Sequence, residues 1–216
     1  MSFDPQTSDL KRLFMDPHMF DSAEDWHDAG FKIVRDSETK ILVARHKAAD
    51  GYLFKKYTNR IPLNEQLAKF KRRVEGARKL RSLIAEKHLR RIVVPQKWLR
   101  ELPREFSRGG VPSYVLIVEK FPILDKDDSE YEHEEIDEDT LRELCVVVYA
   151  CTHLDFTARN APFTKRGQIA FIDTEYLDWN VTKSWQKYLE NVGKYVSSRR
   201  LDFAKRLWNE LGGGGA

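Results

Sequence analysis

Four polar side chains in the second half of the chain have types and spacing that could serve one reaction. His153, Asp155 and Asn160 fit the pattern H-x-D-x-x-x-x-N after a run rich in apolar residues. Asp173 comes thirteen residues later, at the end of the apolar run AFID. Carboxylate and amide oxygens are hard donors that suit Mg²⁺. Taken singly, each residue is as well explained as a helix-end histidine or a loop-capping side chain, but the joint spacing favours a catalytic and metal-binding set.

In order and separation, these residues resemble the catalytic loop and the metal-binding aspartate of the protein kinase superfamily. The resemblance implies that Asp155 orients or deprotonates an acceptor hydroxyl, and that Asn160 and Asp173 ligate Mg²⁺ or Mn²⁺. It implies a structural role for His153, which would bridge the catalytic loop to the strand that carries Asp173. Phosphoryl transfer suits this pattern, because the protein contributes mainly positioning and charge to that reaction.

Two adjacent lysines in the segment GYLFKKY extend the resemblance to the first half of the chain. Kinases carry a nucleotide-binding lysine on their third strand, and this segment is the third strand expected here. Side chains alternate along a strand, so Lys55 and Lys56 point to opposite faces and only one can approach the phosphates of ATP. Lys55 is favoured because Leu53 and Lys55 match the V-A-I-K spacing, and Lys56 stays the alternative. Glu75 is the expected ion-pair partner on the following helix, since Glu86 lies too near the helix end.

The apolar run SYVLIVEKF resembles the strand that leads into the hinge of kinases. By that resemblance Val118 takes the place of the gatekeeper residue. Glu119 and Phe121 would then offer backbone groups to the adenine ring. Together with the lysine, these residues form the nucleotide-binding set that the resemblance implies.

Several kinase features are missing from the sequence. The turn RDSETK contains no glycine where a glycine-rich loop would cover the phosphates, which lowers the expected nucleotide affinity. Asp173 is followed by Thr174 and Glu175 in place of Phe-Gly, and no A-P-E motif follows. Only 43 residues come after Asp173, too few for an activation segment and a full helical lobe. The pattern is closer to minimal kinases of bacterial effectors, or to small-molecule and lipid phosphotransferases, than to a conventional Ser/Thr or Tyr kinase.

Local patterns predict the elements that would position these residues. Three antiparallel strands are predicted by FKIV, KILVARH and GYLFKKY, which are rich in β-branched and aromatic residues and separated by turn compositions. Residues 63–89 repeat apolar side chains with the 3.6-residue period of an amphipathic helix. Two more strands are predicted by RIVVPQKWL and SYVLIVEKF. Farther along, the pattern predicts a buried helix over 141–154, a hairpin that turns at Gly167, and one or two closing helices.

These elements predict an α+β protein with a two-lobed, protein-kinase-like fold. The N-lobe would hold a five-stranded antiparallel sheet plus one helix, and the C-lobe would be reduced and mostly helical. Before the sheet, Ser22 with Asp25 three residues later predicts a helix start. The expected order is an N-terminal extension (1–30), the N-lobe (31–124), an acidic, solvated linker (125–139), the C-lobe (140–211) and a flexible tail (212–216).

The composition predicts a folded protein of a reducing compartment. Hydrophobic residues make up 41% of the chain, and 37 basic and 34 acidic side chains nearly cancel, so bulk charge indicates no partner. Cys145 and Cys151 are expected as free, buried thiols on different faces of a helix. No secretory signal and no membrane-spanning run is found, which predicts a cytoplasmic location, or a host cytosol for a bacterial effector.

The stretch 67–91 is strongly basic, with ten Lys or Arg against two Glu. Such a helix could contact a polyanion, for example an inositol phosphate, or an acidic membrane surface. The alternative is a solvated outer face. Nucleic acid is disfavoured because no aromatic side chains are interleaved for stacking.

The function expected from these observations is an ATP- and Mg²⁺-dependent phosphotransferase, an atypical protein kinase that transfers the γ-phosphate to a hydroxyl acceptor. The acceptor would be a protein, a lipid or a small molecule, and transfer of AMP is a variant within the same class. The alternative is a pseudokinase, a nucleotide-binding interaction module without catalysis. The missing glycines and the shortened second lobe motivate that alternative.

Overall fold

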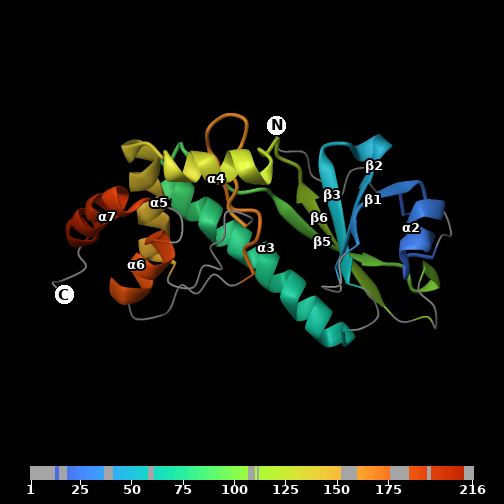
Figure 1. Cartoon of the computed structure of the whole chain (residues 1–216). Helices are drawn as coiled ribbons and strands as arrows, with labels where there is room; N and C mark the ends of the chain where they lie inside the picture. The colour runs from blue at the N-terminus through green and yellow to red at the C-terminus, as the bar shows by residue number, and fades with distance from the viewer. Residues whose placement is uncertain are drawn as a thin grey trace. The chain divides into compact units, whose positions relative to one another are not determined.

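The computed structural model of the chain describes residues 13–14, 19–36, 41–57, 61–106, 110, 112–151, 160–175, 185–193 and 196–211. The chain divides into two units: unit 1 holds Met1–Val74 and Gln96–Lys120, and unit 2 holds Glu75–Pro95 and Phe121–Ala216 (Figure 1). The expected α+β class, with a five-stranded antiparallel sheet, is confirmed. Within the described ranges, no helix has the length and apolar character needed to cross a membrane.

Unit 1 is built on the five-stranded sheet. Its strands are β1 (Phe31–Asp36), β2 (Ile41–His46), β3 (Tyr52–Tyr57), β5 (Lys97–Leu102) and β6 (Ser113–Glu119), in the order β1-β2-β3-β6-β5. All neighbouring pairs are antiparallel, and β6 is mostly buried, as its apolar composition predicts. The segment RIVVPQKWL is split, because only Lys97 onward joins this sheet. Pro95 explains the split, since proline cannot donate a hydrogen bond to a ladder.

One face of the sheet is covered by the N-terminal extension. Phe14, Phe20 and Trp26 are buried in one cluster with Phe31 and Phe54 of the sheet. The expected helix start is confirmed, since α2 (Ala23–Asp28) begins with a capping box between Ser22 and Asp25. The extension, to which the sequence assigned no role, therefore supplies the aromatic core of this face.

The opposite face of the sheet packs on the first half of α3 (Leu63–Glu86). Phe70 and Val74 of α3 share a core with Tyr57 of β3 and with Leu116 and Val118 of β6. These side chains follow the predicted helical period, so the amphipathic stripe is what attaches the helix to the sheet.

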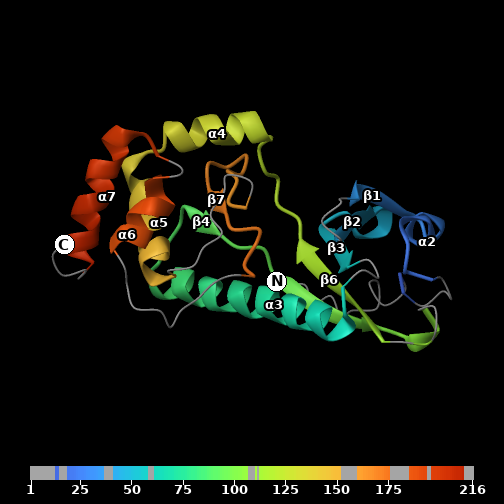
Figure 2. The same cartoon turned by 60° about the horizontal axis from the view of Figure 1, so that its bottom comes forward.

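Unit 2 is mostly helical. It contains the second half of α3 together with β4 (Ile92–Val93), α4 (Lys126–Glu134), α5 (Glu138–Ala150), β7 (Ile169–Ala170), α6 (Trp185–Gly193) and α7 (Ser198–Glu210). Figure 2 shows α5, α6 and α7 side by side, and β4 and β7 form a parallel pair. Leu80 and Ile92 belong to the unit 2 core, so residues 75–95, expected in the first lobe, pack here instead. Cys145 and Cys151 are buried thiols outside any disulfide, as expected.

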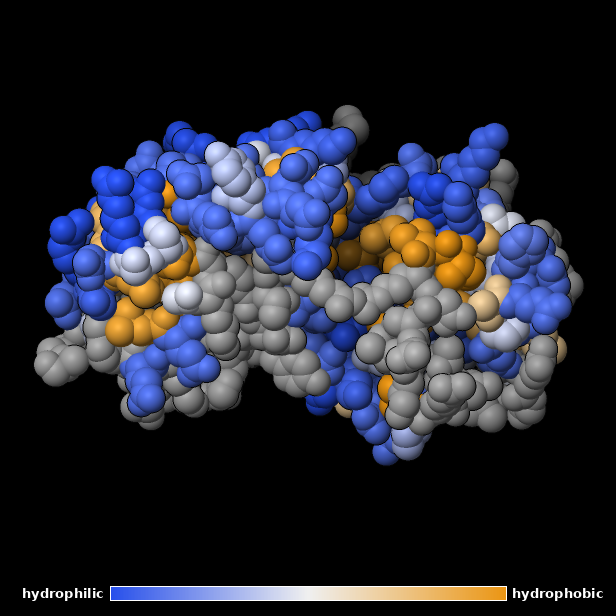
Figure 3. Space-filling view, in the orientation of Figure 1, coloured by the Kyte–Doolittle hydropathy of each residue, from blue (hydrophilic) through white to orange (hydrophobic). Residues whose placement is uncertain are grey.

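The acidic stretch 125–139 is mostly exposed, as expected of a solvated linker, but it is more regular than its composition indicated. Most of it is helix α4, whose N-cap Asp125 accepts a hydrogen bond from the backbone N–H of Asp128 at 3.0 Å. The surface over α4 is mostly hydrophilic in Figure 3, but Ser129 and His133 are buried. These two side chains are four residues apart, so they lie on one face of the helix. That face contacts the backbone of residues 161–163.

Candidate functional site

A hairpin brings two of the predicted site residues, Asn160 and Asp173, together. The backbone carbonyl of Asn160 accepts hydrogen bonds from the N–H groups of Ile172, at 2.9 Å, and Asp173, at 3.4 Å. The chain reverses at Gly167, whose φ of +69° is the left-handed conformation that favours glycine. An amide and a carboxylate thirteen residues apart therefore lie at the same end of one hairpin.

The chain turns directly after Asp173. The Oδ1 atom of Asp173 accepts a hydrogen bond from the backbone N–H of Glu175 at 3.1 Å, the short-range bond that aspartate commonly makes in turns. Asp173 is half-buried, whereas Thr174 and Glu175 are buried. The two residues that stand in place of Phe-Gly thus help to fix the backbone beside the Asp173 carboxylate.

His153 and Asp155 lie outside the described residues. Their roles as structural histidine and catalytic base stay predictions. The described residues nearest to them are Cys151, the C-cap of α5, and Asn160.

Lys55 and Lys56 lie on opposite faces of β3, as alternation requires. Lys55 is half-buried and shares a face with Leu53 and Tyr57, which both contact the core formed with α3. Lys56 is on the other face, where its Nζ lies 3.4 Å from Oδ1 of Asp21, and both side chains are buried. Burial lowers the pKa of Lys56, while the nearby Asp21 carboxylate acts to raise it. Lys56 is therefore engaged in an ion pair inside the core that the N-terminal extension completes.

Val118 and Glu119 occupy the end of β6, next to β3. Val118 is buried and pairs with Leu53 across the strands. The backbone N–H of Glu119 donates to the carbonyl of Gln96 at 2.9 Å, and its side chain accepts from the N–H of Gln96 at 3.0 Å. Its amide is thus already used, which limits the backbone groups that Glu119 can offer to an adenine ring.

Phe121 follows β6 and belongs to unit 2. It is half-buried, and its backbone carbonyl accepts a hydrogen bond from the N–H of Ile123 at 3.0 Å. Its predicted contact with adenine stays a prediction.

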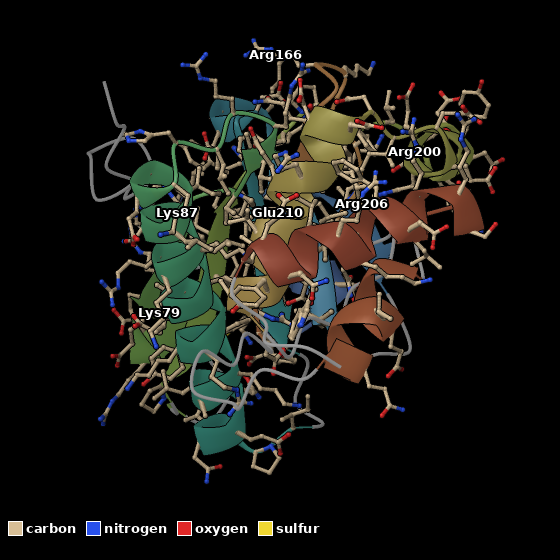
Figure 4. All side chains as sticks on the ribbon, turned by 90° about the vertical axis from the view of Figure 1, so that its left-hand side faces the viewer. Lys79, Lys87, Arg166, Arg200, Arg206 and Glu210 are labelled. Carbon is tan, nitrogen blue, oxygen red and sulfur yellow. The ribbon has the colours of Figure 1, made fainter. Side chains whose placement is uncertain are left out.

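Glu75 lies on the solvated side of α3. Its carboxylate accepts hydrogen bonds from Arg78 at 2.7 and 2.9 Å, and Lys79 lies 3.8 Å away. The hydrogen bond from Arg78 is the main cause that lowers the pKa of Glu75. Figure 4 shows Lys79 projecting outward from the helix. The described partners of Glu75 are thus cations of its own helix, and its pairing with Lys55 stays a prediction.

Part of the positive charge of the stretch 67–91 is balanced by acids on α3 itself. Besides Arg78, Lys69 pairs with Glu65 at 2.8 Å and Lys87 pairs with Glu86 at 2.9 Å. Surface pairs of this kind contribute little to stability, but they reduce the net charge that a polyanion would meet. Contact with a polyanion or an acidic membrane surface stays a prediction.

Ser129, His133 and Asp21 are residues near these groups that sequence reasoning missed. Ser129 and His133 bond to the backbone just after Asn160, and Asp21 pairs with Lys56. One signal was present in the sequence, because Ser129 and His133 are four residues apart within a mostly acidic run. Asp21 carried no local signal, since its partner is 35 residues away.

Comparison with solved structures gives distant matches. No protein-family model and no curated protein matches the chain. A crystal structure of WbdD matches with 16% sequence identity and a TM-score of 0.48, covering 83% of this chain and 41% of that one. A second structure, of the bifunctional kinase-methyltransferase WbdD, matches with 16% identity and a TM-score of 0.44, covering 83% of this chain and 37% of that one. The chain thus spans less than half the length of WbdD, and the activities of that whole enzyme are not transferred to it.

Proposed function

We propose that the chain is an ATP- and Mg²⁺-dependent phosphotransferase that transfers the γ-phosphate to a hydroxyl acceptor. The observation that carries the proposal is the hydrogen bonding of the Asn160 carbonyl to Ile172 and Asp173. It brings the predicted metal-binding amide and carboxylate to one end of a hairpin, in the order that resembles protein kinases.

The side chains available suit Mg²⁺ held together with a nucleotide. Proteins usually bind this ion through one or two carboxylates plus substrate phosphates, so Asp173 and the amide oxygen of Asn160 would be a sufficient protein contribution. Among the described residues, no group of three or more His, Cys, Asp or Glu forms a competing metal cluster. Bound there, Mg²⁺ would neutralise charge on the phosphate oxygens.

The remaining roles follow from the resemblance and from the faces of β3. Lys55 is the nucleotide lysine in this proposal, because Lys56 is buried against Asp21 on the other face. Asp155 would orient the acceptor hydroxyl and take its proton. The acceptor class, a protein, a lipid or a small molecule, is left to experiment.

Transfer from radiolabelled ATP tests the proposal. The full chain is incubated with [γ-³²P]ATP and Mg²⁺ or Mn²⁺, with and without a eukaryotic cell lysate, beside Asp155→Ala and Asp173→Ala. Asp28→Ala, which removes an exposed carboxylate, is the matched control. We expect label on the protein or on a lysate component with wild type and the control only. [α-³²P]ATP in parallel distinguishes transfer of AMP from transfer of phosphate.

A second candidate, a pseudokinase that binds nucleotide without transferring phosphate, is favoured by the engagement of Glu75. Its carboxylate is hydrogen bonded to Arg78, the neighbour one turn along α3. A kinase would need that carboxylate, or another, to orient its nucleotide lysine. A thermal shift on adding ATP and Mn²⁺, without label transfer under any condition, would support this candidate. The absence of both signals would contradict both candidates.

A further inference from the structure

Helix α4 makes two hydrogen bonds to the backbone that directly follows Asn160. The Oγ atom of Ser129 accepts a bond from the N–H of Phe163 at 2.9 Å. The Nε2 atom of His133 lies 3.0 Å from the carbonyl oxygen of Ala161. A carbonyl can only accept, so Nε2 carries the hydrogen and donates it. Both bonds reach backbone atoms within three residues of Asn160.

The two residues that α4 buries are both polar, which distinguishes it from an ordinary packing helix. Ser129 is 1% exposed and His133 is 2% exposed, while the other residues of α4 are exposed. A surface helix normally attaches itself through apolar side chains, and buried polar groups are disfavoured unless they are hydrogen bonded. Burial therefore makes these two bonds the specific link between α4 and the segment 161–163. The imidazole ring also packs on Phe163, with ring centroids 4.7 Å apart.

The same segment is bonded on its other side to the strand that carries Asp173. The N–H of Ala170 donates to the carbonyl of Pro162 at 2.8 Å, and the N–H of Ile172 donates to that of Asn160 at 2.9 Å. The segment 160–163 thus lies between α4 and residues 170–173, and Figures 1 and 2 both show this orange hairpin beside α4. Hydrogen bonds therefore hold this segment from both sides, by α4 and by the strand that carries Asp173.

We propose that His133 and Ser129 are positioning residues for the metal site, which hold the amide of Asn160 at a fixed place relative to the carboxylate of Asp173. The inference rests on the proposed function, because it assumes that these two side chains bind the divalent cation. Groups that orient metal ligands typically change metal affinity by about 10- to 100-fold when they are lost. Neither His133 nor Ser129 would touch the metal.

Substitutions at His133 separate the hydrogen bond from the packing. His133→Phe keeps an aromatic ring against Phe163 and removes the donor to Ala161. His133→Gln keeps a donor of similar reach and is the conservative rescue. His27→Phe, at an exposed histidine in unit 1, is the matched control.

Ser129→Ala tests the second bond. It removes the acceptor for the N–H of Phe163 with little change in volume. Ser82→Ala is its matched control, because Ser82 is an exposed serine of α3 that bonds to its own helix.

Mn²⁺ binding in the presence of ATP is the first readout, measured by calorimetry or by the electron paramagnetic resonance of free Mn²⁺. We expect His133→Phe and Ser129→Ala to raise the half-saturating Mn²⁺ concentration about tenfold, and His133→Gln and the controls to stay within about twofold of wild type. Where transfer is measured, kcat at saturating Mn²⁺ should change much less than the metal requirement. A loss of folded protein alone would lower the apparent kcat and leave the half-saturating Mn²⁺ concentration unchanged.

A double substitution tests whether His133 acts through Asn160. In the Asn160→Ala background, adding His133→Phe should change Mn²⁺ binding no further, because the ligand that it positions is gone. An equal tenfold loss in both backgrounds, or wild-type binding by His133→Phe, would overturn the inference and leave the proposed function standing. Wild-type protein that binds no Mn²⁺ with ATP would instead refute the proposed function and the inference with it.

Discussion

The two adjacent lysines of β3 should respond to substitution in opposite ways. Lys56 and Asp21 are 4% and 6% exposed, with Nζ and Oδ1 3.4 Å apart. At that distance and an effective dielectric constant of about 20, their attraction is about 5 kcal/mol, which desolvation of both charges offsets in part. Lys56→Met leaves the Asp21 carboxylate buried beside an apolar side chain. We therefore expect it to lower the free energy of unfolding by about 3–5 kcal/mol.

Lys55→Met should lower the free energy of unfolding by only about 1 kcal/mol, because Lys55 is half-buried on the other face of β3. The two variants are compared by urea unfolding and by label transfer from [γ-³²P]ATP, with transfer expressed per folded molecule. Lys55→Met should fold and lose transfer, whereas Lys56→Met should be destabilised and keep transfer. The double variant Lys56→Met/Asp21→Asn removes both charges and should recover part of the lost stability.

One pair of results would contradict these roles of Lys55 and Lys56. If Lys56→Met unfolds at the wild-type urea midpoint and loses transfer, the buried ion pair does not form as described. If Lys55→Met also keeps transfer, Lys56 is the nucleotide lysine, and the nucleotide does not lie on the Lys55 face of β3.

Three further predictions concern the cores and the buried histidine. Trp26→Ala should lower the free energy of unfolding, measured in urea, by about 3–5 kcal/mol, because Trp26 is 1% exposed within the sheet core. Met19→Ala, at an exposed apolar residue, is the control. Equal effects of the two substitutions would contradict the packing role of the extension. Burial is the main cause that lowers the pKa of His133, so protonation favours the unfolded chain and the free energy of unfolding should fall as pH drops below about 6.5. His133→Gln should lack that part of the pH dependence, and identical pH profiles would show that His133 does not titrate in this way. Cys145 and Cys151 are buried, and burial raises the pKa of the Cys151 thiol. A thiol reagent should therefore label both cysteines only as fast as the protein unfolds. Rapid labelling of the native protein would contradict their burial.

Several elements could be predicted from the sequence because neighbouring residues decide them. The β-branched and aromatic runs within residues 31–57, separated by turn residues, specified three strands, and the 3.6-residue period after position 63 specified α3. Ser22 with Asp25 specified a capping box, and Gly167 specified the turn of the hairpin. Asn160 and Asp173 were expected at one metal site only through the resemblance to kinases, and the folded hairpin is what joins their backbones.

The acidic stretch shows what such reasoning leaves out, because it is mostly exposed yet buries Ser129 and His133. Its charge indicated a solvated linker, and only the backbone of residues 161–163, about thirty positions farther along the chain, gives Ser129 and His133 a buried partner. Similarly, Pro95 excludes part of a predicted strand from the sheet, but the partner that β4 then finds, β7, comes from a distant part of the chain.

The choice between Lys55 and Lys56 was also decided by tertiary structure. The sequence determined that the two lysines point to opposite faces, because alternation along a strand is a local property. It did not determine what covers each face. Asp21 and the aromatic side chains of the N-terminal extension bury Lys56, whereas α3 covers the face of Lys55. Local periodicity is set by residues within one turn or strand, but the partners of a face are chosen by burial and charge pairing between segments that only the folded chain brings together.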